Sequence, residues 1–64
     1  MEKYKVAMIM ESNEFRSWTG LAVDKNHAEG LAIAEATKHG EQVYEIKYTG
    51  IKHENGSLTL CEGY

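Results

Sequence analysis

The sequence lacks the cysteines that would form disulfides and the long apolar runs that would span a membrane. Cys61 is its only cysteine, so no disulfide can form within the chain. A lone cysteine, together with an N-terminus that has no apolar signal-peptide region, indicates a reducing, intracellular setting, and we expect a cytoplasmic protein. No apolar run approaches the roughly 20 residues that span a bilayer, so we expect no membrane partner.

The chain also lacks an excess of basic residues. Seven lysines and arginines stand against ten acidic residues, which gives a net charge of −3. Nucleic-acid-binding domains usually carry a basic stripe, so this balance makes nucleic acid an unfavoured partner. Mixed charges of this kind are typical of a solvated surface.

No catalytic, metal or phosphate-binding signature stands out. Asp24, Asn26 and Glu35 match three positions of a calcium-binding loop, but the glycine that such a loop requires at its sixth position is absent. His53 and Cys61 have no tight ligand pair of the zinc type beside them. A chain of 64 residues also has little room for a pocket around a nucleophile. We therefore expect neither an enzyme nor a site for a metal or cofactor.

What the sequence does contain is one clear helix, over residues 24–39. Asp24 or Asn26 can cap its start, and Gly40 follows its end. The helical period gathers Gly30, Leu31, Ile33, Ala34 and Thr37 on the side that we expect to face a sheet, and Ala28, Ala32 and Ala36 on the opposite side. We expect Gly30 to permit close contact between helix and sheet, in return for a helix-propensity cost of about 1 kcal/mol.

Four strand-like runs flank this helix, over residues 4–11, 15–23, 43–53 and 58–61. A single right-handed crossover places the third run beside the first, which gives a sheet order of 2-1-3-4. The prediction is an α+β fold: a three- to four-stranded antiparallel sheet with one helix on one face, in a single domain of residues 1–64, frayed at residues 62–64. Asn55-Gly56 predicts a type I′ turn between the last two strands.

One helix hides only one face of a sheet, yet the first two strands carry large apolar residues on both faces. The face expected to meet the helix holds Tyr4, Val6, Met8 and Met10 from the first run, Phe15, Leu21 and Val23 from the second, and Tyr44, Ile46 and Tyr48 from the third. Ile9 and Trp18 are expected on the other face, with Gly20 marking a bulge or a close backbone approach.

The uncovered face leads to a functional hypothesis. We expect a small protein-binding module that acts by stoichiometric contact, because tryptophan and arginine are enriched at interface centres. The predicted contact surface is the helix-free face together with the edge that the second run forms, and its residues are Ile9, Arg16, Trp18, Lys47 and Thr49. Two alternatives stay open: a nucleic-acid-binding module that uses Tyr44, Tyr48, Trp18 and the lysines, and a homodimer with stacked sheets.

The order of elements carries a resemblance. Tyr4-Lys5-Val6, the turn entry Glu11-Ser12 and the helical segment of residues 29–34 resemble small bacteriophage proteins that bind and inhibit host proteins, among them the phage T7 inhibitor of bacterial RNA polymerase and several anti-CRISPR proteins. The resemblance covers residues 4–52 and implies an inhibitor of a host protein. The polymerase inhibitor's pair of arginines on the third strand is absent here, so no site residue is carried over.

Overall fold

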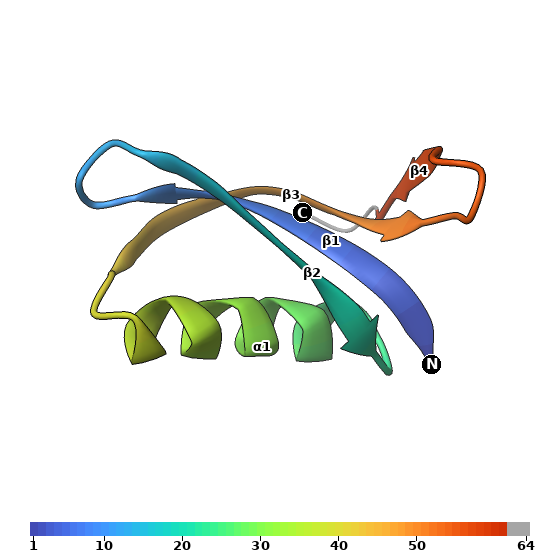
Figure 1. The fold of residues 1–64 in the computed structure, drawn as a ribbon, viewed down its shortest axis with the longest axis horizontal. Coiled ribbons are helices and arrows are strands. Elements are labelled where there is room, and N and C mark those ends of the chain that lie inside the picture. The colour runs from blue at the N-terminus through green and yellow to red at the C-terminus, as the bar shows by residue number, and fades with distance from the viewer. Residues whose placement is uncertain (62–64) are drawn as a thin grey trace.

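The computed structural model describes residues 1–61 and arranges them as one helix on one antiparallel sheet (Figure 1). The predicted α+β fold and strand order are confirmed, because the sheet runs β2-β1-β3-β4. The bounds are Glu2–Met10 for β1, Phe15–Ala22 for β2, Lys25–Lys38 for α1, Val43–Lys52 for β3 and Leu58–Leu60 for β4. Residues 62–64, where we expected fraying, lie outside the described residues. No helix in the described part of the chain is long and apolar enough to span a membrane.

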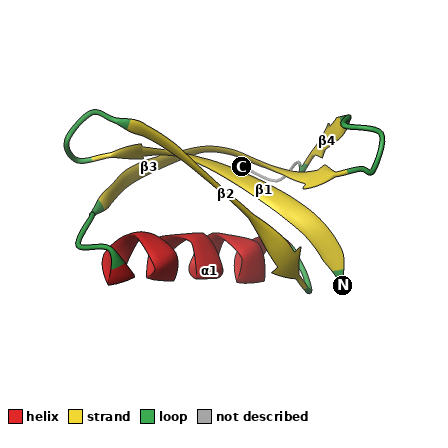
Figure 2. Ribbon diagram, viewed as in Figure 1, coloured by secondary structure: helices red, strands yellow, loops and turns green. Residues whose placement is uncertain are grey.

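The core lies between β1 and α1. β1 is the central strand, and its alternate side chains point at the helix as predicted. These side chains are almost fully buried: Tyr4, Val6, Met8 and Met10. Long side chains from the sheet therefore fill most of the space between the two layers, which Figure 2 shows as a red helix beneath a yellow sheet.

The helix meets this core with its alanines, so the predicted helix face was wrong except for Leu31, which is partly buried against the core. Ala28, Ala32 and Ala36 are buried, whereas Ile33 is 41% exposed. The alanines are spaced four residues apart and form one stripe along α1. Because the methionines and the tyrosine of β1 already fill the interlayer space, the helix packs through its smallest side chains. The prediction from helical periodicity placed Leu31 and Ile33 against the sheet and so did not identify the alanine stripe.

Both ends of α1 are capped by local hydrogen bonds. The Asp24 carboxylate accepts from the His27 N–H at 2.8 Å, and Nδ1 of His27 accepts from the Val23 N–H at 3.0 Å. Asp24 is thus the cap, and Asn26 is not. At the other end, the N–H groups of Gly40 and Glu41 donate to the carbonyls of Thr37 and Ala36, in a Schellman motif with Gly40 at a φ of 79°.

β2 turns its tryptophan toward the helix, opposite to our prediction. β1 and β2 pair without any register break, and Trp18 lies opposite Val6 and packs against the core. Opposed residues of antiparallel strands share a face, so Phe15 and Leu21 point away from the helix. No bulge forms at Gly20. Because side chains alternate without a break along β2, either Trp18 or Phe15 and Leu21 must face the helix. Pairing with β1 places Trp18 opposite the buried Val6, so Trp18 is the residue on the helix side.

β3 departs from alternation twice. Its pairing with β1 shifts register between Ala7 and Met8 and again between Ile9 and Met10. The extra residues are Lys47 and Tyr44, because Tyr48 pairs with Ala7 while Ile46 pairs with Met8. The prediction that Tyr44, Ile46 and Tyr48 share one face is therefore wrong. Ile46 and Thr49 face the helix, and Tyr48 faces the opposite side.

Each of the two hairpins has a tight turn followed by one residue in the left-handed backbone conformation. Asn13 has a φ of 71°, and Gly56 has a φ of 89°. The Gly56 N–H donates to the His53 carbonyl, so Glu54 and Asn55 are the central turn residues. Asn55 has no positive φ, which rules out the type I′ turn that we predicted. The geometry is that of a type I turn followed by a glycine bulge.

Two glycines differ sharply in the space around them. A Cβ added to Gly20 would lie 2.7 Å from Cζ2 of Trp18, so the indole ring lies directly over this glycine. A Cβ added to Gly30 would meet nothing within 4 Å, which overturns the expected close contact at that position. Gly20 is required by packing, whereas Gly30 only lowers helix propensity.

We predict that Gly30→Ala raises the free energy of unfolding by about 1 kcal/mol, because it adds helix propensity without a clash. Gly20→Ala is the matched substitution, and it should lower the same quantity by about 1–3 kcal/mol through overpacking against the indole ring. Urea denaturation of both variants measures the difference. Equal effects of the two substitutions would contradict the described packing of Trp18.

We predict an alkaline loss of stability that depends on Tyr4. Burial raises the pKa of the Tyr4 phenol, with smaller contributions from the charges of Cys61, Asp24 and Glu2. A raised folded-state pKa means that the native state holds this proton more tightly, so the contribution to stability is present below the unfolded pKa of about 10 and is lost as the pH rises above it. Tyr4→Phe should flatten the fall in melting temperature between about pH 9 and 11. A parallel fall in both proteins would contradict the prediction.

Candidate protein-binding surfaces

The sheet has one face without a helix, which we call the outer face. Strand register assigns its side chains, because Ile9 pairs with Phe15 while Ala7 pairs with Tyr48. Its large apolar members are Ile9, Phe15, Leu21, Tyr48, Leu58 and Leu60. β4 lifts away from the plane of the sheet (Figure 1), so Leu58 lies over Gly50, where an added Cβ would be 2.9 Å from Cγ of Leu58.

Three of these apolar side chains are more than half exposed. Phe15 is 56% exposed, Leu21 61% and Leu60 57%, although all three belong to strands. Isolated exposed leucines are normal on protein surfaces. Exposed apolar side chains on two strands, with half-buried ones on the same face of the other strands, are of the kind that marks an interaction site.

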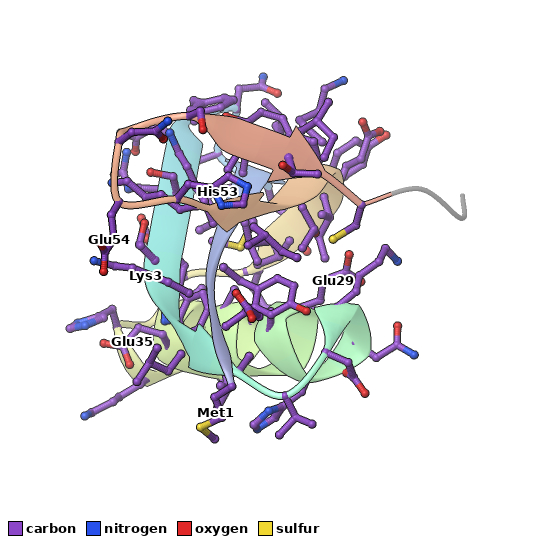
Figure 3. All side chains as sticks on the ribbon, turned by 90° about the vertical axis from the view of Figure 1, so that its right-hand side faces the viewer. Met1, Lys3, Glu29, Glu35, His53 and Glu54 are labelled. Atoms are coloured by element: carbon purple, nitrogen blue, oxygen red, sulfur yellow. The ribbon has the colours of Figure 1, made fainter. Side chains whose placement is uncertain are left out.

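Lysines lie between the leucines of the two edge strands at one end of the outer face. Lys3 lies opposite Leu21, and Lys5 lies between Thr19 and Gly50 in the neighbouring strands. Lys52 pairs with Leu58. Within residues 1–61, Lys3, Lys5 and Lys52 form no ion pair. In Figure 3, Lys3 and the helical Glu29 lie on opposite sides of the β1 ribbon. The chain is acidic overall, yet the cations of this face are available to a partner.

The predicted contact residues do not share one surface. Ile9 is on the outer face as expected. Trp18 and Thr49 lie on the helix side, which contradicts their predicted facing, and Thr49 is only 1% exposed. Lys47 is an exposed bulge residue paired with Glu45 at 3.0 Å.

Thr49 has a structural partner of its own. Its hydroxyl donates to Oε2 of Glu29 at 2.6 Å, and the same carboxylate oxygen lies 3.4 Å from Nζ of Lys25. The bond joins the middle of β3 to the first half of α1. The bulge at Lys47 turns the Thr49 side chain toward the helix, and the bond to Glu29 gives its buried hydroxyl a partner.

Arg16 and Trp18 meet on the helix side instead, at the β2 edge. They border a hollow of about 230 Å³. Its floor consists of Met8, Met10, Ala32 and Ala36, and Glu35, His39 and Glu41 stand around its rim. The hollow is shallow and mostly apolar, so it offers contact area rather than a set of converging catalytic groups.

Carboxylates hold Arg16 in place. Its Nη2 lies 2.9 Å from Glu14 and 3.4 Å from Glu41. The hydrogen bond to Glu14, followed by the charges of Glu14 and Glu41, raises the pKa of Arg16 further above its usual value. The guanidinium is therefore a permanent cation held toward Glu14 and Glu41 at the β2 edge.

Facing was the information that sequence reasoning lacked. Phe15, Leu21, Leu58 and Leu60 were recognised as apolar strand residues, but their exposure was not predicted. The spacing of Phe15 and Leu21 showed that they share a face, and only the pairing with β1 shows which one. Cys61 packs against the core, while Nε2 of His53 lies 2.7 Å from Oγ1 of Thr59. Across residues 1–61, no three potential metal ligands come together.

Comparison with protein-family models, with curated proteins and with solved structures found no match. Function is therefore argued from these surfaces.

We predict that Thr49→Val lowers the free energy of unfolding by about 1–3 kcal/mol, because Glu29 loses a hydrogen-bond donor at a partly buried position. Thr19→Val is the control, since Thr19 is exposed on the outer face. Thermal unfolding of both variants measures the contrast. A Thr49→Val protein as stable as the control would contradict a structural role for this hydroxyl.

Proposed function

We propose that the protein is a protein-binding module that acts by stoichiometric contact through its outer face. The observation that carries the proposal is the exposure of Phe15, Leu21 and Leu60 on the helix-free side of the sheet. Both inner strands, β1 and β3, are already paired on both sides, so the face is preformed. Preformed surfaces lose little conformational entropy on binding.

The composition of the face defines the partner's chemistry. The exposed leucines and aromatic residues favour apolar groups on the partner. The lysines at one end, Lys3, Lys5 and Lys52, favour carboxylates beside those groups. Such charges act mainly on the association rate and on specificity. The proposed partner is therefore a protein with an apolar surface that also carries acidic residues.

Contact alone is the mode of action that we propose. A bound domain of this size acts on its partner by covering a surface, which is the way an inhibitor works. The resemblance of the strand order to bacteriophage inhibitors favours that role, and we include it in the proposal. Fold similarity alone does not determine function, so binding has to be tested directly.

Binding of nucleic acid is the weaker proposal. Lysines and Tyr48 on a sheet face are compatible with it, because bases stack on exposed aromatic rings. Trp18, on which this alternative also depended, packs against the core on the helix side. Leucines, which stack poorly, make up much of the outer face.

We predict that Leu21→Ser combined with Leu60→Ser weakens binding of the partner at least tenfold, since full burial of a leucine side chain contributes about 1.5–3 kcal/mol. The control is Ile33→Ser, which removes an exposed aliphatic side chain from α1. Tagged protein is used to isolate a partner from cells of the source, and titration calorimetry of the purified pair then gives affinity and stoichiometry.

A one-to-one complex that the outer-face variant loses and the helix variant keeps would support the proposal. Wild-type affinity in the outer-face variant would contradict it. Retention on nucleic acid that falls steeply with salt, with no protein partner, would favour the weaker alternative.

A further inference from the structure

β2 is an edge strand with free backbone groups. The Met10 N–H donates to the Glu14 carbonyl at 2.9 Å, and this bond sets the phase of the β1–β2 ladder. Hydrogen-bonded and non-hydrogen-bonded pairs alternate in antiparallel strands, so Arg16, Trp18 and Gly20 direct their backbone groups at β1. The N–H and C=O groups that point out of the edge belong to Phe15, Ser17, Thr19 and Leu21. Within residues 1–61 their only hydrogen-bond partner is Nη1 of Arg16, at 3.3 Å from the Phe15 carbonyl.

The usual protections of an edge strand are missing from β2. Natural edges are blunted by bulges, prolines, charges or short length. β2 is eight residues long, pairs without a bulge and contains one charged residue, Arg16. β4, at the opposite edge, is only three residues long. The two edges therefore differ, and β2 is the one suited to pairing with another strand.

We propose that β2 pairs with β2 of a second copy, antiparallel and around a two-fold axis at Trp18. The edge-directed residues of one copy have to face those of the other. Only one symmetric register pairs all four of them, which are Phe15, Ser17, Thr19 and Leu21. In that register Phe15 faces the partner's Leu21, and Ser17 faces the partner's Thr19. Four pairs with two bonds each give about eight backbone hydrogen bonds and one continuous eight-stranded sheet.

Side chains on both faces complement one another in this register. On the outer face, the ring of Phe15 would contact the partner's Leu21, and both side chains are exposed in the single copy. The hydroxyl of Ser17 would lie beside that of the partner's Thr19. Like charges do not oppose each other, because the two copies of Arg16 are four residues apart along the strands, about 13 Å.

On the helix side, the glycine of one copy makes room for the arginine of the other. The Trp18 ring lies over its own Gly20, and the partner's Arg16 is opposite that glycine. The guanidinium of the partner's Arg16 is thereby placed beside the indole ring, where a cation is attracted to the π-face. The two indole rings point along their strands in opposite directions, so they do not compete for space at the axis.

The pairing is argued from the backbone groups of the β2 edge and not from the proposed function, although the contact of Phe15 with the partner's Leu21 uses two residues of the outer face. Its consequence is that both helices lie on one side and the two outer faces join on the other. A partner protein would then meet a surface of twice the width.

Charge exchange tests both the pairing and its register. Ser17→Lys with Thr19→Lys places lysines directly opposite each other in the proposed dimer, and Ser17→Glu with Thr19→Glu does the same with carboxylates. Each double variant should be monomeric by sedimentation at about 0.1 mM, where the wild type is dimeric with any Kd tighter than about 10 μM. Mixing the two variants should restore the dimer mass, because each new lysine then faces a new glutamate. Circular dichroism checks that both variants keep the fold.

Three outcomes would overturn the proposal: a monomeric wild type, double variants that stay dimeric on their own, or a mixture that stays monomeric while both components are folded. Restoration only in the mixture supports pairing through β2.

Discussion

Side chains alternate along β1, and this strand is hydrogen-bonded to a neighbour on each side. Its even-numbered residues from Tyr4 to Met10 are long, apolar and buried against α1. Every other facing in the sheet is set by pairing to them. Trp18 lies inside because it is opposite Val6, and Phe15 is exposed because it is opposite Ile9. The helix adapts to this arrangement, and its alanine stripe lies where the side chains of β1 leave little room.

Much of the architecture could be predicted from local signals. Periodicity, the Asp24 cap and the stop at Gly40 predicted the helix, and one crossover predicted the strand order. These features depend on residues close in sequence. Facing depends on pairing between distant segments, and the predicted facing was right for β1 but wrong for β2 and for part of β3. The bulges at Tyr44 and Lys47 leave no mark in the sequence, because the extra residue of such a bulge need not be glycine.

The prediction of one shared contact surface was wrong for the same reason. The predicted contact surface combined the helix-free face with the edge of the second strand, and it required Trp18 and Thr49 to point away from the helix. Thr49 instead bonds Glu29, and Trp18 lies over Gly20. The general expectation of an uncovered apolar face survives with other members, and it follows from geometry. One helix cannot cover two faces of a sheet, so the residues that pair with Lys3, Ala7 and Ile9 of β1 are left exposed.

The facing of Trp18 distinguishes the helix-side packing of the structure from the outer-face position predicted from the sequence. Nuclear Overhauser contacts of the indole protons measure that facing directly. We expect contacts between the indole ring and the methyl groups of Ala32, Ala36 and Met8, which share the hollow on the helix side. Contacts to Ile9 or Tyr48 would place the ring on the outer face. They would contradict the register of β2, the composition of the outer face and the proposed dimer together.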